Sequence, residues 1–585
     1  MKLVISEYLR TLKERDELDR LLPDLLVEMG YVPIARPQTG NRQFGVDLAL
    51  RGMNLKTNLE ELLLLVVKQG DIGRQEWDGN VQGVRSSINE ILDVYLKSCV
   101  EPQDTGKPVR IVLATNGELK QTIQASWSGY VTDHEARANI EFWGTDCLSE
   151  LVEEHLLNEH VFRDEDRKNL RRALALSGDS EYDRRDFHKL LLRALDLTDQ
   201  GGLADQPKTG KALIKALRIV NFAAHTFAAW AITDGDARQG LKGMERALLW
   251  SWHRIQLADE KDRNAAIADA FSSMWLGYLN ISRQYFDRLQ QHCFVEDGLF
   301  GYYSDGSEFS LVAFEQIGSL STIGLSQVFF SSQDPGITEA YRQNADVVAD
   351  AVAALIRNNP ICNSPCFDRH SQDITLAMTL LLTTNRIDEA KAWLRRLVRN
   401  VDYAFKAKRY VPISSDSLDD LADAGGWHTG QTEDRLLTTS WMLATLAGWS
   451  ALSGLDECYA VIRKGSLDLY AETCMQLWHP DADIYKHIYF KPAHYECGAS
   501  EAPIKLPATA NEWREHMRVI VKSQQNEIAS KSMASQAGIP ALELIACRHF
   551  STPLAPYFWY RFASIMFPDE TAVSTDVADP APLVS

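Results

Sequence analysis

Two short, unbroken apolar runs constrain the fold of this chain more than any other feature. They read LLLLVVK at Leu62–Lys68 and VRIVLAT at Val109–Thr115. Apolar runs of about four to eight residues, rich in branched side chains, are typical of strands that are buried on both faces. The second run ends at Asn116-Gly117, which is a turn signal. Both runs therefore predict central strands of an α/β domain.

Weaker patterns on either side of these runs complete an alternation of helices and strands. We expect helices at Ile5–Met29, Val81–Leu96, Glu118–Tyr130 and Asp146–Leu157, and further strands at Tyr31–Ala35, Phe44–Leu50 and Ile140–Trp143. Such an order predicts a mixed sheet flanked by helices.

The chain has 585 residues, which exceeds the size of a typical single core, so we expect more than one domain. Residues 1–162 form the predicted α/β domain, and residues 163–199 form a highly charged connector. Residues 200–567 show helical spacing without a strict repeat, which predicts a large all-α domain. The polar residues 568–585 are expected to form a disordered tail.

The net charge of −19 argues against a protein that coats nucleic acid through bulk electrostatics. Any contact with DNA would need a local basic groove, a divalent metal or a partner. Nine scattered cysteines do not form a secreted disulfide framework, and the N-terminus has no apolar signal core. The longest apolar stretch, Ala212–Ile232, is interrupted by charged residues. We therefore expect a cytoplasmic protein that does not span a membrane.

Four segments carry a resemblance to a known family. They are LDRLLPDLLVEMGY at Leu18–Tyr31, FGVDLAL at Phe44–Leu50, LVVKQGDI at Leu65–Ile72, and VRIVLATNGELKQTIQASW from Val109 onward. In order and spacing they resemble the Mrr-like branch of the restriction-endonuclease-fold, or PD-(D/E)XK, nucleases. The resemblance covers about the first quarter of the chain, and the helical remainder resembles no family that we recognise.

The resemblance implies a catalytic site for DNA cleavage. Asp47 matches the family's metal-binding carboxylate, and Asp19 matches its helical acidic residue, so both are expected to bind Mg²⁺ or Mn²⁺. Lys68 matches the lysine that orients or activates the attacking water. Without the resemblance, Asp19 reads as a solvated helix residue and Lys68 as the residue where a strand meets solvent.

One position departs from the family pattern. The family has Glu or Gln two residues before the lysine, and this chain has Val66. Side chains two apart on a strand share a face, so Val66 and Lys68 point the same way, and valine cannot bind a metal. The candidates to replace the missing group are Glu60, Glu61, Gln69 and Asp71, and Trp77 and Gln82 begin a region where related nucleases place supporting polar groups.

The helical region offers weaker candidates. Cys362, Cys366 and His370 lie close together but lack the usual zinc spacing. His479–Cys497 gathers histidines, aspartates and cysteine, and Trp427-His428 precedes Glu433 and Asp434. A packed aromatic segment or an acidic helix start explains each of these as well. No phosphate-binding loop, dinucleotide fingerprint or nucleophile elbow occurs in the sequence.

Three functions remain open at this point. The first is a metal-dependent DNA endonuclease that serves in bacterial anti-phage defence and is regulated by its helical domain, a protein partner or homo-oligomerisation. The second is a nuclease-fold scaffold that has lost metal binding and binds a partner or nucleic acid. The third is a small-molecule or peptide sensor in the helical region, with a pocket lined by Trp427, His428, Trp441, Trp449, Trp478 and His479.

Overall fold

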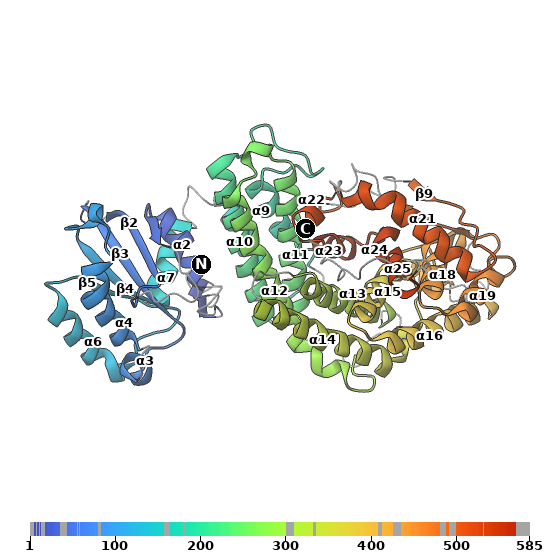
Figure 1. Ribbon diagram of the computed structural model, residues 1–585, viewed down its shortest axis with the longest axis horizontal. Helices are drawn as coiled ribbons and strands as arrows, with labels where there is room; N and C mark the ends of the chain where they lie inside the picture. Colours follow the sequence, from blue (N-terminus) through green and yellow to red (C-terminus); the bar gives the residue numbers. More distant parts are fainter. Residues whose placement is uncertain are drawn as a thin grey trace, which may run out of the picture. The chain divides into compact units, whose positions relative to one another are not determined.

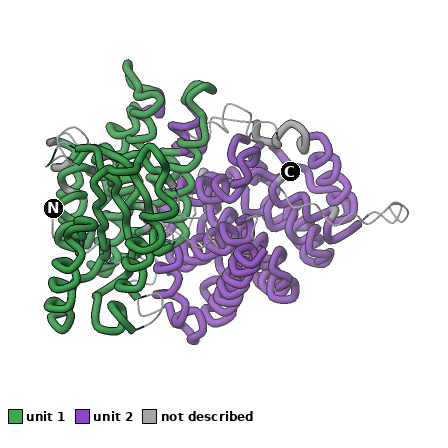
Figure 2. The backbone as a smooth tube through the Cα atoms, turned by 60° about the vertical axis from the view of Figure 1, so that its left-hand side comes forward, with its two compact units in different colours: residues 1–199, 203–251, 258–281 green, residues 200–202, 252–257, 282–585 purple. Residues whose placement is uncertain are grey.

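The computed structural model describes residues 5–6, 9–10, 12, 18–35, 44–54, 57, 59–79, 83–156, 164–179, 182–299, 309–330, 335–407, 412–424, 434–479, 487–490, 499–529 and 532–568. The chain divides into two compact units (Figure 2). Unit 1 comprises residues 1–199, 203–251 and 258–281, and unit 2 comprises residues 200–202, 252–257 and 282–585.

The N-terminal part of unit 1 contains a five-stranded mixed sheet in the order β1-β2-β3-β4-β5 (Figure 1). The strands are β1 Val32–Ala35, β2 Leu48–Asn54, β3 Leu59–Lys68, β4 Val109–Thr115 and β5 Asn139–Trp143. Strand β2 pairs antiparallel with both β1 and β3. Strand β4 pairs parallel with β3, and β5 pairs parallel with β4. The prediction of a mixed sheet is confirmed, and so are the two central strands.

Helices cover both faces of this sheet, which is why β3 and β4 are almost continuously apolar. Helices α4 Val84–Glu90 and α6 Gln121–His134 lie on one face, and α2 Asp19–Glu28 and α7 Thr145–Leu151 lie on the other (Figure 1). The remaining short elements are α3 Arg74–Asp78, η2 Ile91–Tyr95, α5 Leu96–Ser98, η3 Pro102–Asp104 and η4 Val152–Leu156.

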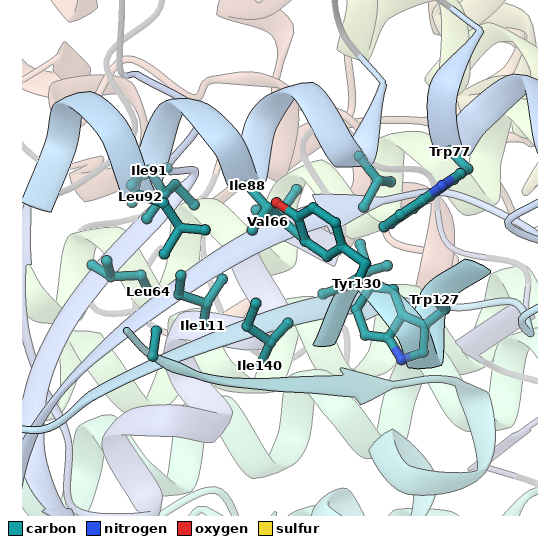
Figure 3. Packing of buried hydrophobic residues seen from close by; sticks show 14 of the residues in the cluster. Leu64, Val66, Trp77, Ile88, Ile91, Leu92, Ile111, Trp127, Tyr130 and Ile140 are labelled. Atoms are coloured by element: carbon teal, nitrogen blue, oxygen red, sulfur yellow. The ribbon is translucent and has the colours of Figure 1, made fainter. Parts of the chain in front are cut away.

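The core between the sheet and α4 and α6 is apolar (Figure 3). Val66 of β3 packs there with Ile88 of α4 and with an aromatic group from α3 and α6. In that group Trp77 meets Trp127 and Tyr130 edge to face, with ring centroids 5.6 and 5.3 Å apart. Aromatic pairs in this geometry add about 0.5–1.5 kcal/mol beyond their buried area.

The start of the second strand was predicted wrongly. The expected strand began at Phe44, whereas β2 begins at Leu48. Phe44 and Gly45 have φ angles of 50° and 81°, so they form a turn that an extended strand cannot contain. Helix α3 was not predicted, because five residues are too few for a helical period to show.

The rest of the described chain is mostly helical. In the charged stretch after the sheet lie α8 Asp164–Ala175 and α9 Arg185–Ala194, followed by α10 Gly210–Thr233, α11 Ala237–Gln256, η5 Glu260–Asp262 and α12 Ala265–Cys293. The later helices are α13 Phe309–Val328, α14 Pro335–Asn358, η7 Pro360–Asn363, α15 His370–Thr383, α16 Ile387–Lys406, α17 Leu418–Ala424, η8 Asp434–Leu437, α18 Trp441–Leu452, α19 Asp456–Gly465, α21 Ala510–Ala529, α22 Met533–Gln536, α23 Ala541–His549, α24 Pro556–Tyr560 and α25 Phe562–Met566.

Four very short strands interrupt this helical region, which departs from the all-α expectation. They are β6 Thr439–Ser440, β7 Cys474–Met475, β8 Leu477–His479 and β9 Ala499–Glu501, and they form two separate pairs. Among the residues described, no helix combines the length and the apolar character that crossing a membrane requires.

Candidate nuclease site

Asp47, the residue directly before β2, is hydrogen-bonded to the C-terminal end of β3. Its backbone N–H donates to the carbonyl oxygen of Leu65 at 2.9 Å. Its side-chain Oδ2 accepts from the backbone N–H of Val67 at 2.7 Å. The carboxylate oxygen thereby replaces the backbone carbonyl that would accept this N–H if the strand pairing continued. These bonds hold the half-buried side chain in one orientation.

The turn before Asp47 is fixed by a close approach to α4. A Cβ at Gly45 would lie 2.2 Å from the carbonyl oxygen of Ser87, so only glycine fits there. The positive φ of Gly45 points to the same residue type. Gly45 therefore sets the path by which the chain enters β2, and with it the position of Asp47.

Lys68 is the last residue of β3 and lies beside Thr115 of β4. Leu65 faces Leu48 and also accepts from the Asp47 N–H, so the regular register ends at Leu48. Val66 and Lys68 share one face of β3, and Asp47 lies at the same open end of the β2–β3 hairpin as Lys68. Within the described part of the chain no carboxylate forms an ion pair with Lys68.

A polar clamp fixes the chain just after Lys68, and the sequence patterns did not reveal it. Asn116 accepts from the backbone N–H of Gly70 at 2.7 Å and donates to the carbonyl oxygens of Leu9 and Leu12 at 2.9 and 2.6 Å. Thr115 donates to the Gly70 carbonyl oxygen at 2.7 Å. The only sequence signal was a polar residue directly after a buried strand, which also reads as an ordinary turn.

Val66 stands where the family has a metal-binding or polar side chain, and it belongs to the apolar core. It is 1% exposed and lies among Leu64, Ile111 and Ile88 (Figure 3). A carboxylate at this position would have to extend past the core to reach the sheet end, because a buried unpaired charge is costly. The position at which this chain differs from the nuclease pattern is therefore one where the sheet face is tightly packed.

Glu61 and Glu60 do not replace the missing group. Glu61 accepts from the Tyr31 hydroxyl at 2.7 Å and from Asn54 Nδ2 at 2.8 Å, and it forms a buried ion pair with Arg110. Glu60 pairs with Lys107 at 2.9 Å. Seven strand residues at a rise of about 3.3 Å separate Glu61 from Lys68 by roughly 23 Å. Both glutamates therefore belong to the opposite end of the sheet.

Asp71 and Gln69 lie at the same end as Lys68, and both side chains are exposed. Asp71 Oδ1 accepts from the backbone N–H of Glu118 at 3.0 Å. Asp19 lies in α2, but its side chain is outside the described residues, as is the whole of Gln82. In the described ranges no three His, Cys, Asp or Glu side chains are grouped in a way that could hold a metal ion.

In the helical region, Cys362, Cys366 and His370 do not form a metal site among the described residues. Burial raises the pKa of the Cys362 thiol to about 12 and also raises that of Cys366. His370 stacks on Phe314 with ring centroids 4.3 Å apart, and burial holds its pKa well below the usual value. These residues therefore fill a core.

Of the aromatic side chains proposed to line a pocket, Trp449 is fully buried. It stacks on Trp559 with centroids 5.1 Å apart and donates to Thr375 Oγ1 at 3.3 Å, as a core residue does. Trp478 is also buried. Trp427, His428 and Glu433 lie outside the described residues, as do the Asp434 side chain and most of His479–Cys497.

Comparison with known proteins adds no relative. No protein-family model matches this chain, and no curated protein or solved structure is significantly similar to it.

Proposed function

We propose that the N-terminal α/β part is a metal-dependent endonuclease with a restriction-endonuclease-like fold, similar to the Mrr-like branch, that cuts DNA. The observation that carries the proposal is that Asp47, bonded to the Val67 N–H, and Lys68, the last residue of β3, lie at the same open end of the β2–β3 hairpin. A carboxylate and a lysine at one sheet end can bind a divalent metal and the scissile phosphate together.

This sheet end offers a carboxylate, which is a ligand that Mg²⁺ and Mn²⁺ prefer. Mg²⁺ usually keeps several waters and takes one or two protein carboxylates together with substrate phosphates. Asp47 supplies one carboxylate, whose two oxygens together offer about four lone-pair sites. Bound metal would polarise the phosphate and lower the pKa of the attacking water. Asp19 is proposed as the second carboxylate.

Lys68 would compensate phosphate charge beside the metal. In a chain of net charge −19, such local cations and the metal must provide the attraction for DNA. By analogy of architecture alone, a nuclease joined to a large helical part suits a cytoplasmic anti-phage effector that a protein partner or self-association regulates.

Metal binding tests this proposal before any substrate is known. We expect Mn²⁺ titrated into the full chain to bind, and Asp47→Asn to weaken that binding at least tenfold, because asparagine keeps the acceptor for Val67 but loses the charge. Glu60→Gln, which removes an exposed carboxylate at the opposite end of the sheet, serves as the matched control. Equal Mn²⁺ affinity in the wild type and Asp47→Asn would exclude Asp47 as a ligand.

A scaffold without catalysis is the second candidate, and Val66 favours it. With Val66 in the core and Asp47 Oδ2 bonded to Val67, the same geometry would keep the fold after metal binding was lost. Absence of any Mn²⁺ binding by the folded wild type would support this candidate over the nuclease.

A further inference from the structure

In unit 2, the carboxyl group of Asp373 lies between two central helices without a hydrogen-bond donor. Asp373 belongs to α15, which packs closely on α13, and it is 6% exposed. Among the described residues, Asp373 has no hydrogen-bond or ion-pair partner. A Cβ added to Gly318 of α13 would lie 1.9 Å from Asp373 Oδ1. The carboxyl group thus occupies the space that any other residue at Gly318 would fill.

The charged groups that face Asp373 do not neutralise it at close range. Arg548 of α23 and Arg369, the residue before α15, favour its ionised form, and Glu315 of α13 opposes it. Arg548 donates instead to Ser319 Oγ at 3.2 Å, and Arg369 pairs with Asp416 at 3.5 Å. His370, one turn earlier on α15, is buried and uncharged at neutral pH because burial lowers its pKa.

Among the described residues, the other helices packed on α15 form no ion pair with Asp373. On α23, the buried Glu543 accepts hydrogen bonds from Ser532 and Ser535, and His549 is partly exposed. On α14 every charged side chain is exposed, on α16 none is buried, and α18 contains no ionisable residue. Burial is therefore the dominant influence on Asp373, and it raises the pKa of this carboxyl group to about 8.

We propose that Asp373 is a proton-dependent control of the packing between α13 and α15. With its proton bound, the carboxyl group fits against the backbone of Gly318 as a neutral group. When the proton leaves to solvent, an uncompensated charge remains inside the interface and favours an open arrangement in which water or Arg548 reaches the carboxylate. Because α15 also contacts α14, α16, α18 and α23, opening of the α13–α15 interface loosens the packing of these helices as well.

The sign of the effect follows from linkage. The folded state holds this proton up to about pH 8, whereas an exposed aspartate releases it near pH 4. Between these values the closed state binds one proton more than the open state. The opening equilibrium constant therefore rises about tenfold per pH unit from pH 5 to 7 and levels off above pH 8.

Hydrogen exchange of the α13 and α15 amides in the full chain tests this, after correction for the intrinsic pH dependence of exchange. In the wild type, the opening equilibrium constant should rise with pH up to about pH 8. In Asp373→Asn it should be flat above pH 7, because the amide has no proton to lose and the carboxyl group of Asp368, whose pKa burial raises to about 6, is already ionised there. Asp350→Asn, which removes an exposed carboxylate of α14, should behave as the wild type. Equal slopes in the wild type and Asp373→Asn would overturn the proposal.

Infrared spectroscopy of the wild type supplies a second readout that needs no variant. A protonated carboxyl band that is present at pH 7, where Asp368 with its pKa of about 6 is largely ionised, and that disappears on titration to pH 9 is expected. If no protonated carboxyl group is found at pH 7, the proposal is wrong, even if Asp373→Asn does not fold.

Discussion

The Asp47 carboxylate accepts the backbone N–H of Val67 at 2.7 Å, so one side chain both ends the β2–β3 ladder and faces the sheet end that carries Lys68. In Asp47→Asn, asparagine keeps the oxygen that accepts the Val67 N–H and loses only the negative charge. This variant therefore tests the proposed metal-binding role of Asp47 separately from its structural role.

Asp47→Ala should destabilise unit 1 by about 1–3 kcal/mol, since it leaves the Val67 N–H without its acceptor. Asp47→Asn should cost clearly less. Amide exchange of β3 in the full chain measures both free energies. Equal costs for the two variants would mean that the bond to Val67 contributes little to stability.

Gly45 and Gly30 both have a positive φ, but of these two only Gly45 lies so close to another segment that an added Cβ would collide with it. Gly45→Ala should cost about 2–5 kcal/mol, because strain at φ 81° adds to a collision with the Ser87 carbonyl. Gly30→Ala should cost only about 1–2 kcal/mol, because φ is 91° there and a Cβ meets nothing within 4 Å. Urea unfolding of unit 1 compares them, and a smaller loss at Gly45 would contradict the observed path into β2.

The buried pair of Glu61 and Arg110 should be strongly coupled. Replacing Glu61 by leucine leaves the buried Arg110 charge paired only with the partly exposed Glu141 at 3.5 Å among the described carboxylates, and should cost about 3 kcal/mol. The double variant with Arg110→Met should recover much of this loss, because no lone charge then remains in the core. A double-mutant cycle in urea measures the coupling, and additive losses would show that the two side chains act independently.

His370 should make the helical unit sensitive to acid, with a sign opposite to that of Asp373. Its folded pKa lies well below 6.5, so the unfolded chain binds the proton first and stability falls as the pH drops below about 6.5. The loss approaches about 1.4 kcal/mol per pH unit.

The variant His370→Phe keeps a ring against Phe314 and has no proton to gain, so its stability should fall less between pH 6.5 and 5. Thermal unfolding of the wild type and the variant across this range checks the prediction. Parallel curves would assign the acid sensitivity to other groups.

The central strands could be read from the sequence because burial on both faces leaves an unbroken apolar run, as in Leu62–Lys68. The period of two also placed Val66 and Lys68 on one face. The start of β2 could not be read, because the turn at Gly45 depends on contact with Ser87, which is distant in sequence.

Partnerships across the fold were likewise hidden from the sequence. Glu61 looked like a possible replacement ligand until strand pairing placed it beside Tyr31 and Arg110 at the far end of the sheet. The burial of Asp373 could not be predicted from the sequence, because it depends on the packing of α15 against Gly318. Such contacts join residues that no local pattern connects.

The most direct test of the nuclease proposal is cleavage of supercoiled plasmid DNA by the full chain with Mg²⁺ or Mn²⁺. We predict metal-dependent nicking that falls at least a hundredfold in both Asp47→Asn and Lys68→Ala but persists in Glu60→Gln, which changes the opposite end of the sheet. Cleavage that survives in both site variants, or a folded wild type that binds neither metal and cuts nothing, would contradict the assignment of this sheet end as a catalytic site.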